Sequence, residues 1–282
     1  MAAIVIDGEK LAAKIKSKVK QEIAEKKLKP KLSLILVGND PASEIYVKKK
    51  HLACEELGII SDQHFFAENV PEQKVIELIE SLNKDPSVSG ILVQLPLPKQ
   101  FNSLKIMELI FPEKDVDGFH PVNAGKNVIG QDCFKPATPL GVMRILEEYK
   151  IPLEGKNAVI VGTGNITGKP LGLMFLNKNT TVTYCNKYTK NLKDFTSKAD
   201  ILVSAVGKPK LITKDMIKKG AVIIDVGITR LENGKVVGDV DFEEAKKIAS
   251  FITPVPGGTG PLTVACLMQN TLKAEKLKEG IQ

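Results

Sequence analysis

The stretch from Ala158 to Leu173, AVIVGTGNITGKPLGL, constrains the fold of this chain more than any other. Its apolar start, Ala158 to Val161, is typical of a buried strand. The glycines Gly162, Gly164 and Gly168 follow, and an apolar run typical of a helix comes next. A strand, a glycine loop and a helix form the context in which backbone N–H groups cradle a pyrophosphate. The stretch therefore predicts a dinucleotide site, and the alternative is a glycine-rich turn of any α/β protein.

Further strand-like runs alternate with helix-capable segments after this loop. They lie at Thr181–Tyr184, Ile201–Val206, Ala221–Val226 and Phe251–Thr253. Such alternation predicts a Rossmann-type doubly wound parallel sheet. The first half of the chain also alternates, with expected strands at Lys31–Gly38, Ile59–Ala67 and Gly90–Leu97. We therefore expect an α/β protein of two domains, which suits a length of 282 residues.

Composition places the chain among cytoplasmic globular proteins. No apolar run approaches the roughly 20 residues of a membrane span, and the N-terminus does not resemble a secretory signal. The four cysteines form no CxxC pair, and we expect reduced, buried thiols. The three histidines show no metal-ligand spacing, so no metal is predicted. The cysteines are Cys54, Cys133, Cys185 and Cys266, and the histidines are His51, His64 and His120.

The net charge of +7 has two interpretations. The positive charge could attract anionic ligands such as nucleotide phosphates. Alternatively, the lysines lie on solvent-exposed helix faces, and this second interpretation accounts better for most of them. A nucleic-acid surface more often combines arginine with aromatic residues, and this chain has no Trp and only 5% aromatic residues. We expect no nucleic-acid partner and no membrane partner.

Polar residues in the first half of the chain form a candidate site. Ser43, Tyr46 and Lys50 share one helix face, just after a strand. Gln94 is a lone amide in an apolar strand that prolines terminate, and Asp117 lies in the loop EKDVDGFHP. The alternatives are a surface lysine beside a tyrosine at a domain edge, a satisfied core amide, and an Asx-turn with a helix cap.

Two further segments bear on the cofactor. The residue after the second strand of a dinucleotide fold often grips the ribose, and an acidic residue there favours NAD. Here Cys185 to Thr189 contains no carboxylate but includes Lys187, which favours the 2′-phosphate of NADP unless this exposed lysine is incidental. The loop Ile252 to Thr263, ITPVPGGTGPLT, is rich in glycine and proline. It predicts either a rigid surface for a flat ligand or a plain turn.

Seven motifs, in order along nearly the whole chain, resemble one family, the bifunctional methylenetetrahydrofolate dehydrogenase/methenyltetrahydrofolate cyclohydrolases. They are YVKKK at 46–50, GILVQLPLP at 90–98, KDVDGFHPVNAGK at 114–126, KPATPLG at 135–141, DVGI at 225–228, GDVDF at 238–242 and ITPVPGGTGPLT at 252–263. The resemblance implies oxidation of 5,10-methylenetetrahydrofolate with NADP and hydrolysis of the methenyl product to 10-formyltetrahydrofolate. It places the chain in one-carbon metabolism and purine biosynthesis, and it implies a homodimer.

The resemblance also implies residue roles. Lys50 matches the central catalytic group, Tyr46 packs on the folate, Gln94 bonds the lysine and Asp117 holds the pterin. The substrate-binding set implied is Ser43, Tyr46, Lys50, Val93, Gln94, Leu95, Asp117, Pro256, Gly257, Gly258, Gly260, Pro261 and Thr263. The cofactor-binding set is Gly162, Thr163, Gly164, Asn165, Ile166, Lys187, Ile228 and Thr263.

The domain bounds follow from the same motifs. We expect a folate-binding catalytic domain at 1–136, completed by the C-terminal helix 262–282, and an NAD(P)-binding domain at 137–261, with a cleft between them. The family often carries arginine or alanine and then serine where Thr163 and Gly164 stand, so NAD remains an alternative to NADP. The sequence also leaves open a family member with only one of the two activities, a shikimate-type oxidoreductase, and a non-enzymatic nucleotide or nucleic-acid binder.

Overall fold

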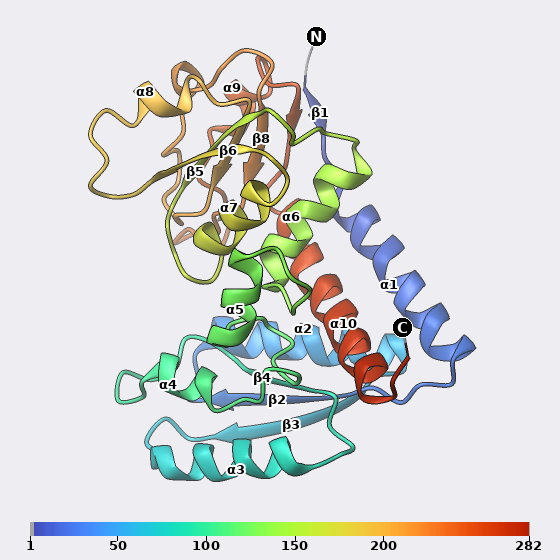
Figure 1. Ribbon diagram of the computed structural model, residues 1–282. Coiled ribbons are helices and arrows are strands. Elements are labelled where there is room, and N and C mark those ends of the chain that lie inside the picture. Colours follow the sequence, from blue (N-terminus) through green and yellow to red (C-terminus); the bar gives the residue numbers. More distant parts are fainter. Residues whose placement is uncertain (1–2, 282) are drawn as a thin grey trace. The chain divides into compact units, whose positions relative to one another are not determined.

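The computed structural model describes residues 3–281 and divides them into two compact units (Figure 1). The six-stranded unit comprises the residues up to Ala12, Asn127–Gln131 and Thr138–Thr263. The three-stranded unit comprises Ala13–Lys126, Asp132–Ala137 and the residues from Val264 onward. The first residues thus belong with the six-stranded unit, because strand β1 (Ile4–Val5) pairs in its sheet.

The six-stranded unit contains the predicted doubly wound parallel sheet. Its strand order is β1-β11-β8-β7-β5-β6, and every neighbouring pair is parallel. The strands after β1 are β5 (Asn157–Val161), β6 (Thr181–Cys185), β7 (Ile201–Ser204), β8 (Val222–Asp225) and β11 (Phe251–Ile252). All five lie within a residue or two of the predicted runs. The central strands β5, β7 and β8 are apolar and rich in β-branched residues because a central parallel strand is buried on both faces, whereas the edge strand β6 is more exposed.

Short helices and one hairpin complete this unit. They are α6 (Ala137–Glu148), α7 (Gly168–Leu176), α8 (Lys193–Thr196), the 3₁₀ helix η1 (Lys214–Met216), α9 (Phe242–Ala245), and the antiparallel strands β9 (Thr229–Arg230) and β10 (Val236–Val237). Helix α7 contributes the fully buried Phe175. One apolar cluster joins alternate side chains of β5 and β8, Val159 and Ile223 among them, with Ala245 of α9.

The three-stranded unit is a second parallel sheet, in the order β3-β2-β4. Its elements are α1 (Gly8–Glu25), β2 (Lys31–Val37), α2 (Pro41–Leu57), β3 (Ile60–Phe66), α3 (Glu72–Lys84), β4 (Gly90–Val93), α4 (Ser103–Glu108), α5 (Pro121–Val128) and α10 (Thr259–Lys278). Helices α1, α5 and α10 each have residues in both units. Ile35 and Val37 of β2 pack with Val75 and Ile79 of α3, whereas α2 runs along the other side of the sheet (Figure 1).

Helix α2 is capped at both ends. The Asp40 carboxylate accepts a hydrogen bond from the Ser43 N–H at 2.8 Å and satisfies a donor that the first turn leaves unpaired. At the other end Gly58 adopts φ +77°, a left-handed conformation that glycine adopts without steric cost. These caps fix which residues of α2 face the sheet.

Two details correct the expectations from sequence. Strand β4 ends at Val93, so Gln94 to Leu97 lie beyond it; the Gln94 N–H still bonds Ile35, but Pro96 has no N–H to continue the ladder. Strand β1 was not predicted, because two exposed residues carry no burial pattern.

All four cysteines are buried, as expected. Within residues 3–281, no helix has the length and apolarity that crossing a membrane requires.

Candidate functional site

The Lys50 side chain is buried on helix α2, with only 7% of its surface exposed. Its Nζ donates a hydrogen bond to Gln94 Oε1 at 2.9 Å. Ser43 is also buried on this helix and Tyr46 is half-buried, so the three residues predicted to share a face turn toward the protein rather than toward bulk solvent. A buried amine is costly unless it is partnered, and Lys50 is therefore not an ordinary surface lysine.

The segment after β4 is shaped around this amine. Gln94 Nε2 donates to the Leu95 carbonyl at 2.7 Å, which leaves Oε1 turned toward Lys50. The Ser43 hydroxyl donates to the same carbonyl at 3.5 Å. Val93 is buried and ends the strand. The lone amide thus lies at the carboxyl end of a parallel strand, where α/β folds bind ligands.

The two aspartates of the loop 114–118 have different environments. Asp115 is buried and accepts hydrogen bonds from the N–H groups of Phe119 at 3.1 Å and His120 at 2.8 Å, and from Asn123 Nδ2 at 2.8 Å. It is the turn-forming carboxylate of this loop. Asp117 is half-buried, and its charge acts on Lys50. The structure thus separates a carboxylate that holds the loop from one whose charge acts on the amine.

The backbone around Asp117 is held from several directions. Asn270 of α10 donates to the carbonyls of Val116 at 2.8 Å and Lys135 at 2.9 Å. A Cβ on Gly118, which has φ +70°, would lie 2.7 Å from the Phe134 carbonyl oxygen. Sequence reasoning missed Asn270, and the only signal was an amide that follows the apolar run ACLM and Gln269. These contacts fix the position from which the Asp117 side chain emerges.

Burial and charge oppose each other at Lys50. Burial lowers the pKa of Lys50, because removing an ammonium from water disfavours the charged form, while the negative charge of Asp117 raises it. Burial likewise raises the pKa of Asp117, and Lys50 opposes that shift. Cys54, one turn further along α2, has its pKa raised to about 12 by burial and remains a neutral thiol. The net result is an amine that gives up its proton more readily than an exposed lysine.

The glycine loop of the six-stranded unit is closely packed. A Cβ on Gly168 would lie 1.8 Å from the Gly162 carbonyl oxygen, and a Cβ on Gly162, with φ +104°, would lie 2.3 Å from the Ala205 carbonyl oxygen. A Cβ on Gly164 would meet no atom within 4 Å, and this glycine is exposed. Gly162 and Gly168 therefore allow the loop to turn tightly into α7, whereas Gly164 leaves the loop surface open to a ligand. Asn165 and Ile166 are exposed on the same loop.

The other predicted cofactor residues lie on the same unit. Lys187 is exposed after β6, and its Nζ lies 4.9 Å from the centroid of the Tyr188 ring. Ile228 is 47% exposed after β8. Thr263 Oγ1 lies 2.9 Å from Thr138 Oγ1, which places it beside the start of α6. The exposed lysine suits a phosphate, and the exposed aliphatic side chain suits a planar ring. The open backbone of the glycine loop suits a pyrophosphate. Together these residues fit a dinucleotide.

The segment from Pro256 to Thr263 also contains close backbone contacts. The Gly257 carbonyl accepts from the Gly8 N–H at 3.0 Å, and a Cβ on Gly8 would lie 1.7 Å from the Gly258 carbonyl oxygen. Gly258 is buried, whereas Pro256 is exposed and Gly257, Gly260 and Pro261 are partly exposed. The loop is thus fixed on one side by the start of α1 and open to solvent on the other, as expected of a rigid surface.

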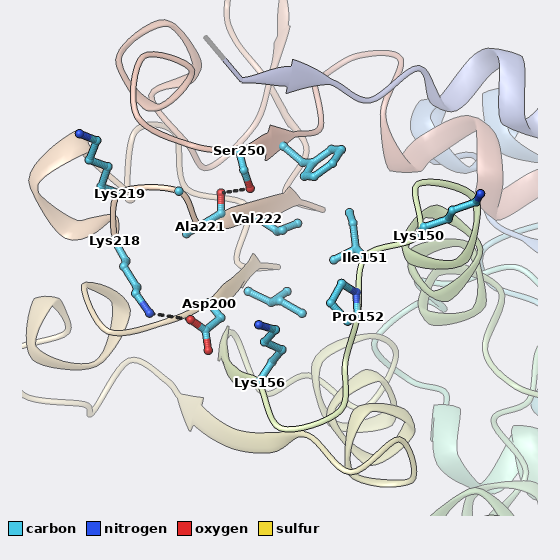
Figure 2. Close-up of a pocket in the computed structure, with 13 residues that line it drawn as sticks. Lys150, Ile151, Pro152, Lys156, Asp200, Lys218, Lys219, Ala221, Val222 and Ser250 are labelled. Carbon is cyan, nitrogen blue, oxygen red and sulfur yellow. Dashed lines mark hydrogen bonds and ion pairs between the residues drawn. The ribbon is translucent and has the colours of Figure 1, made fainter. Parts of the chain in front are cut away.

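A cavity of about 230 Å³ lies elsewhere on the six-stranded unit (Figure 2). It is lined by the first residues of β7, β8 and β11 and by several lysines, of which Lys218 pairs with Asp200 at 2.6 Å. None of the predicted site residues lines it. Because it opens at the amino ends of the strands, it lies at the sheet edge opposite to the glycine loop. Within the described residues, no three acidic, histidine or cysteine side chains gather as a metal site.

The opposing charges at Lys50 predict the result of a substitution. Asp117→Asn removes the negative charge that favours the ammonium, so the pKa of Lys50 falls further below its ordinary value of 10.5. Competitive acylation across a pH series, with the modified peptides quantified by mass spectrometry, reports this pKa. The exposed Lys48 in the same helix serves as internal control. An unchanged or higher pKa for Lys50 contradicts the expected pairing.

Comparison with known proteins places this geometry in a family. Residues 6–117 match the family described as "Tetrahydrofolate dehydrogenase/cyclohydrolase, catalytic domain", and residues 136–279 match its "NAD(P)-binding domain". A "Bifunctional protein FolD" of Sulfurihydrogenibium sp. is 57% identical over 281 residues, 98% of either chain. The crystal structure of the bifunctional FolD of Campylobacter jejuni has a TM-score of 0.96 and 50% identity, covering 98% of this chain and 99% of that one.

A third relative adds a ligand. The dehydrogenase-cyclohydrolase of Trypanosoma brucei, complexed with NADP cofactor and inhibitor, has a TM-score of 0.95 and 36% identity over 98% of each chain. The two family matches together cover most of the sequence and describe a catalytic and an NAD(P)-binding domain. The chain belongs to the tetrahydrofolate dehydrogenase/cyclohydrolase family.

Proposed function

We propose that this protein oxidises 5,10-methylenetetrahydrofolate to 5,10-methenyltetrahydrofolate and then hydrolyses the product to 10-formyltetrahydrofolate. When bound, NADP accepts the hydride that leaves the methylene carbon. The observation that carries the proposal is the buried Lys50 amine, which Gln94 orients at 2.9 Å in a chain of this family. A site of this kind supplies proton transfer, which the hydrolytic half of the reaction requires.

Lys50 acts as the acid and base of the hydrolysis. Water adds to the methenyl carbon, and the neutral amine takes a proton from it. The amine then gives this proton to the ring nitrogen whose bond to carbon breaks, while the second water proton leaves to solvent as the formyl carbonyl forms. The lowered pKa of Lys50 makes a neutral amine accessible nearer to neutral pH than for an exposed lysine.

The neighbouring residues bind and orient. Gln94 fixes the amine without adding a charge, so the pKa of Lys50 stays low. The Asp117 carboxylate accepts hydrogen bonds from the amino group of the pterin, and the Tyr46 ring packs on the folate. Ser43, Val93 and Leu95 shape the wall beside Lys50 through the contact of the Ser43 hydroxyl with the Leu95 carbonyl.

The six-stranded unit holds the dinucleotide. The exposed loop at Gly164 to Ile166 and the N-terminus of α7 bind the pyrophosphate with backbone N–H groups. Lys187 binds the 2′-phosphate that distinguishes NADP from NAD, because no carboxylate follows β6 to claim the ribose hydroxyl. Thr163, Ile228 and Thr263 complete the cofactor site. The loop Pro256 to Thr263 gives a rigid surface for the reacting rings, with Gly257, Gly258, Gly260 and Pro261 as its folate contacts.

The assembly and compartment follow the family resemblance. By function, the domain assignment is a catalytic, folate-binding domain at 1–136 with the final helix, and an NAD(P)-binding domain at 137–261. The compact units differ from this division, because residues up to Ala12 and Asn127–Gln131 pack with the six-stranded unit. The protein is a cytoplasmic homodimer of one-carbon metabolism that binds tetrahydrofolate derivatives rather than nucleic acid or membranes. Size-exclusion chromatography with light scattering tests this assembly, and a monomer at micromolar concentration contradicts it.

Replacing Lys50 tests the acid–base role. Lys50→Met removes the amine, and Lys50→Arg replaces it with a group that stays protonated, so both variants lose about 10²- to 10⁴-fold in cyclohydrolase rate. The rate is measured as the loss of methenyltetrahydrofolate absorbance. Lys48→Met is the control, because Lys48 is exposed on the same helix. Hydrolysis at the wild-type rate by a folded Lys50→Met variant contradicts the assignment.

Replacing Lys187 tests the choice of cofactor. Lys187→Ala removes the proposed phosphate contact, so the KM for NADP rises about ten-fold while the KM for NAD stays nearly constant. Initial dehydrogenase rates across a range of each cofactor give the two constants. Lys190→Ala, which removes an exposed lysine three residues further on, provides the matched control. Equal effects on both cofactors, or no effect, refute the contact.

A further inference from the structure

Two buried carboxylates lie at the carboxyl edge of the six-stranded sheet, and no step above uses them. Asp225 ends strand β8 and is 3% exposed, and Asp239 follows strand β10 and is 0% exposed. Ionised side chains of this kind are rarely buried without partners. Their hydrogen bonds therefore indicate what the pair does.

Asp239 fixes the segment that follows β7. Its Oδ2 accepts from the Ser204 hydroxyl at 2.7 Å and from the Val206 N–H at 2.8 Å, and its Oδ1 accepts from the Lys208 N–H at 2.7 Å. One carboxylate thus ties down three residues across the end of a central strand. This segment adjoins the glycine loop, because the Ala205 carbonyl is the atom that a Cβ on Gly162 would strike.

Asp225 fixes the segments that follow β8 and β11. Its carboxylate accepts from the N–H groups of Gly227 at 3.0 Å, Asp239 at 3.1 Å and Val240 at 2.9 Å. Its own N–H donates to the Thr253 hydroxyl at 2.7 Å, just after β11. The two carboxylates therefore connect the carboxyl ends of β7 and β8 with the segment that follows β10, and the Asp225 N–H adds the segment after β11.

Two glycines make this arrangement possible, and they do so reciprocally. A Cβ on Gly227, two residues after Asp225, would lie 2.1 Å from Asp239 Oδ1. A Cβ on Gly238, just before Asp239, would lie 2.1 Å from Asp225 Oδ2. Each carboxylate thus rests against the glycine beside its partner. The motifs DVG at 225–227 and GDVD at 238–241 therefore pack directly against each other.

Keeping two carboxylates buried here is costly. Burial raises the pKa of Asp225 to about 6, the N–H groups of Val240, Asp239 and Gly227 oppose the shift, and the Asp239 charge adds to it. Two apolar side chains in place of Asp225 and Asp239 would avoid the cost of burying charge, but they would accept no hydrogen bonds. The gain from the carboxylates is therefore the placement of the loop backbones that they bind.

We propose that Asp239, together with Asp225, is a positioning residue for the dinucleotide, and this inference rests on the proposed dehydrogenase function. The loops that the pair fixes lie where parallel sheets bind dinucleotides, outside the carboxyl ends of the strands. Ile228, proposed above as a cofactor contact, follows the Gly227 N–H that Asp225 holds. Small displacements of such contacts lower affinity and misalign the reacting rings. The residues Lys50 and Gln94 belong to the other unit, so we expect hydrolysis to depend on Asp239 far less than NADPH binding does.

Asp239→Asn tests the proposal. Both oxygens of the Asp239 carboxylate accept hydrogen bonds, and the amide NH₂ that replaces one of them cannot accept. In either orientation of the amide, the NH₂ group therefore meets a backbone N–H donor, and one loop segment loses its contact. We expect the Kd for NADPH, measured by its fluorescence, to rise at least about ten-fold. The cyclohydrolase rate on methenyltetrahydrofolate without cofactor stays within about two-fold of wild type. Asp241→Asn is the matched control, since this nearby carboxylate is 27% exposed and lies 3.8 Å from Lys210.

The remaining outcomes decide the inference separately from the proposed function. Unchanged NADPH affinity in Asp239→Asn overturns it, and so does an equal loss of both properties, which indicates only a damaged fold. If Asp239→Asn does not fold, Ser204→Ala, which removes one donor to Asp239, is expected to raise the Kd about three-fold; an unchanged Kd then overturns the inference. Wild-type protein that binds NADPH without dehydrogenase turnover contradicts the proposed function alone, and the binding comparison still stands.

Discussion

The burial of one amine governs the three-stranded unit. Taking Lys50 out of water disfavours its charged form, and the structure offers it one neutral acceptor, Gln94, at 2.9 Å. The negative charge of Asp117 partly restores the stability of the Lys50 ammonium. A carboxylate in place of Gln94 would favour the ammonium more strongly and keep the amine protonated. The balance between burial, a neutral partner and a more distant charge is what makes the lysine suitable for proton transfer.

The surrounding fold maintains that balance. The capped start of α2 fixes the helix face that carries Lys50. Strand β4 ends at Val93, which leaves the next residue, Gln94, free to bond the amine. Asp115 and Asn270 hold the loop that contains Asp117. In the six-stranded unit the same principle applies with backbone atoms. Gly162 and Gly168 touch neighbouring backbone closely, and Asp225 with Asp239 binds the loops beside them. Both units therefore place polar groups at strand ends with contacts that tolerate little displacement.

The sequence predicted those features that depend on local pattern. Strands β5 to β8 follow from strand-like runs, and the shared face of Ser43, Tyr46 and Lys50 follows from helical spacing. The α/β class and the family membership are confirmed. Lys50 and Gln94 are 44 residues apart, so local pattern singles out each of them alone, and only the family resemblance predicted the bond between them.

The features that sequence reasoning missed depend on contacts between distant segments. Asn270 bonds the Val116 carbonyl 154 residues away, and Asp239 bonds the Ser204 hydroxyl 35 residues away. No periodicity or spacing carries such information, because it arises only when loops meet in the fold. The same holds for β1, whose two exposed residues are defined by pairing with Phe251 and Ile252 rather than by burial.

The central claim is that one chain carries both reactions in sequence. The most direct measurement supplies wild-type protein with 5,10-methylenetetrahydrofolate and NADP at neutral pH and quantifies the products by chromatography over time. The account predicts NADPH and 10-formyltetrahydrofolate in equal amounts, with little methenyltetrahydrofolate accumulating. NADPH accompanied by accumulating methenyltetrahydrofolate, with formyl product forming no faster than without protein, would contradict the role of Lys50. Absence of NADPH would contradict the dehydrogenase.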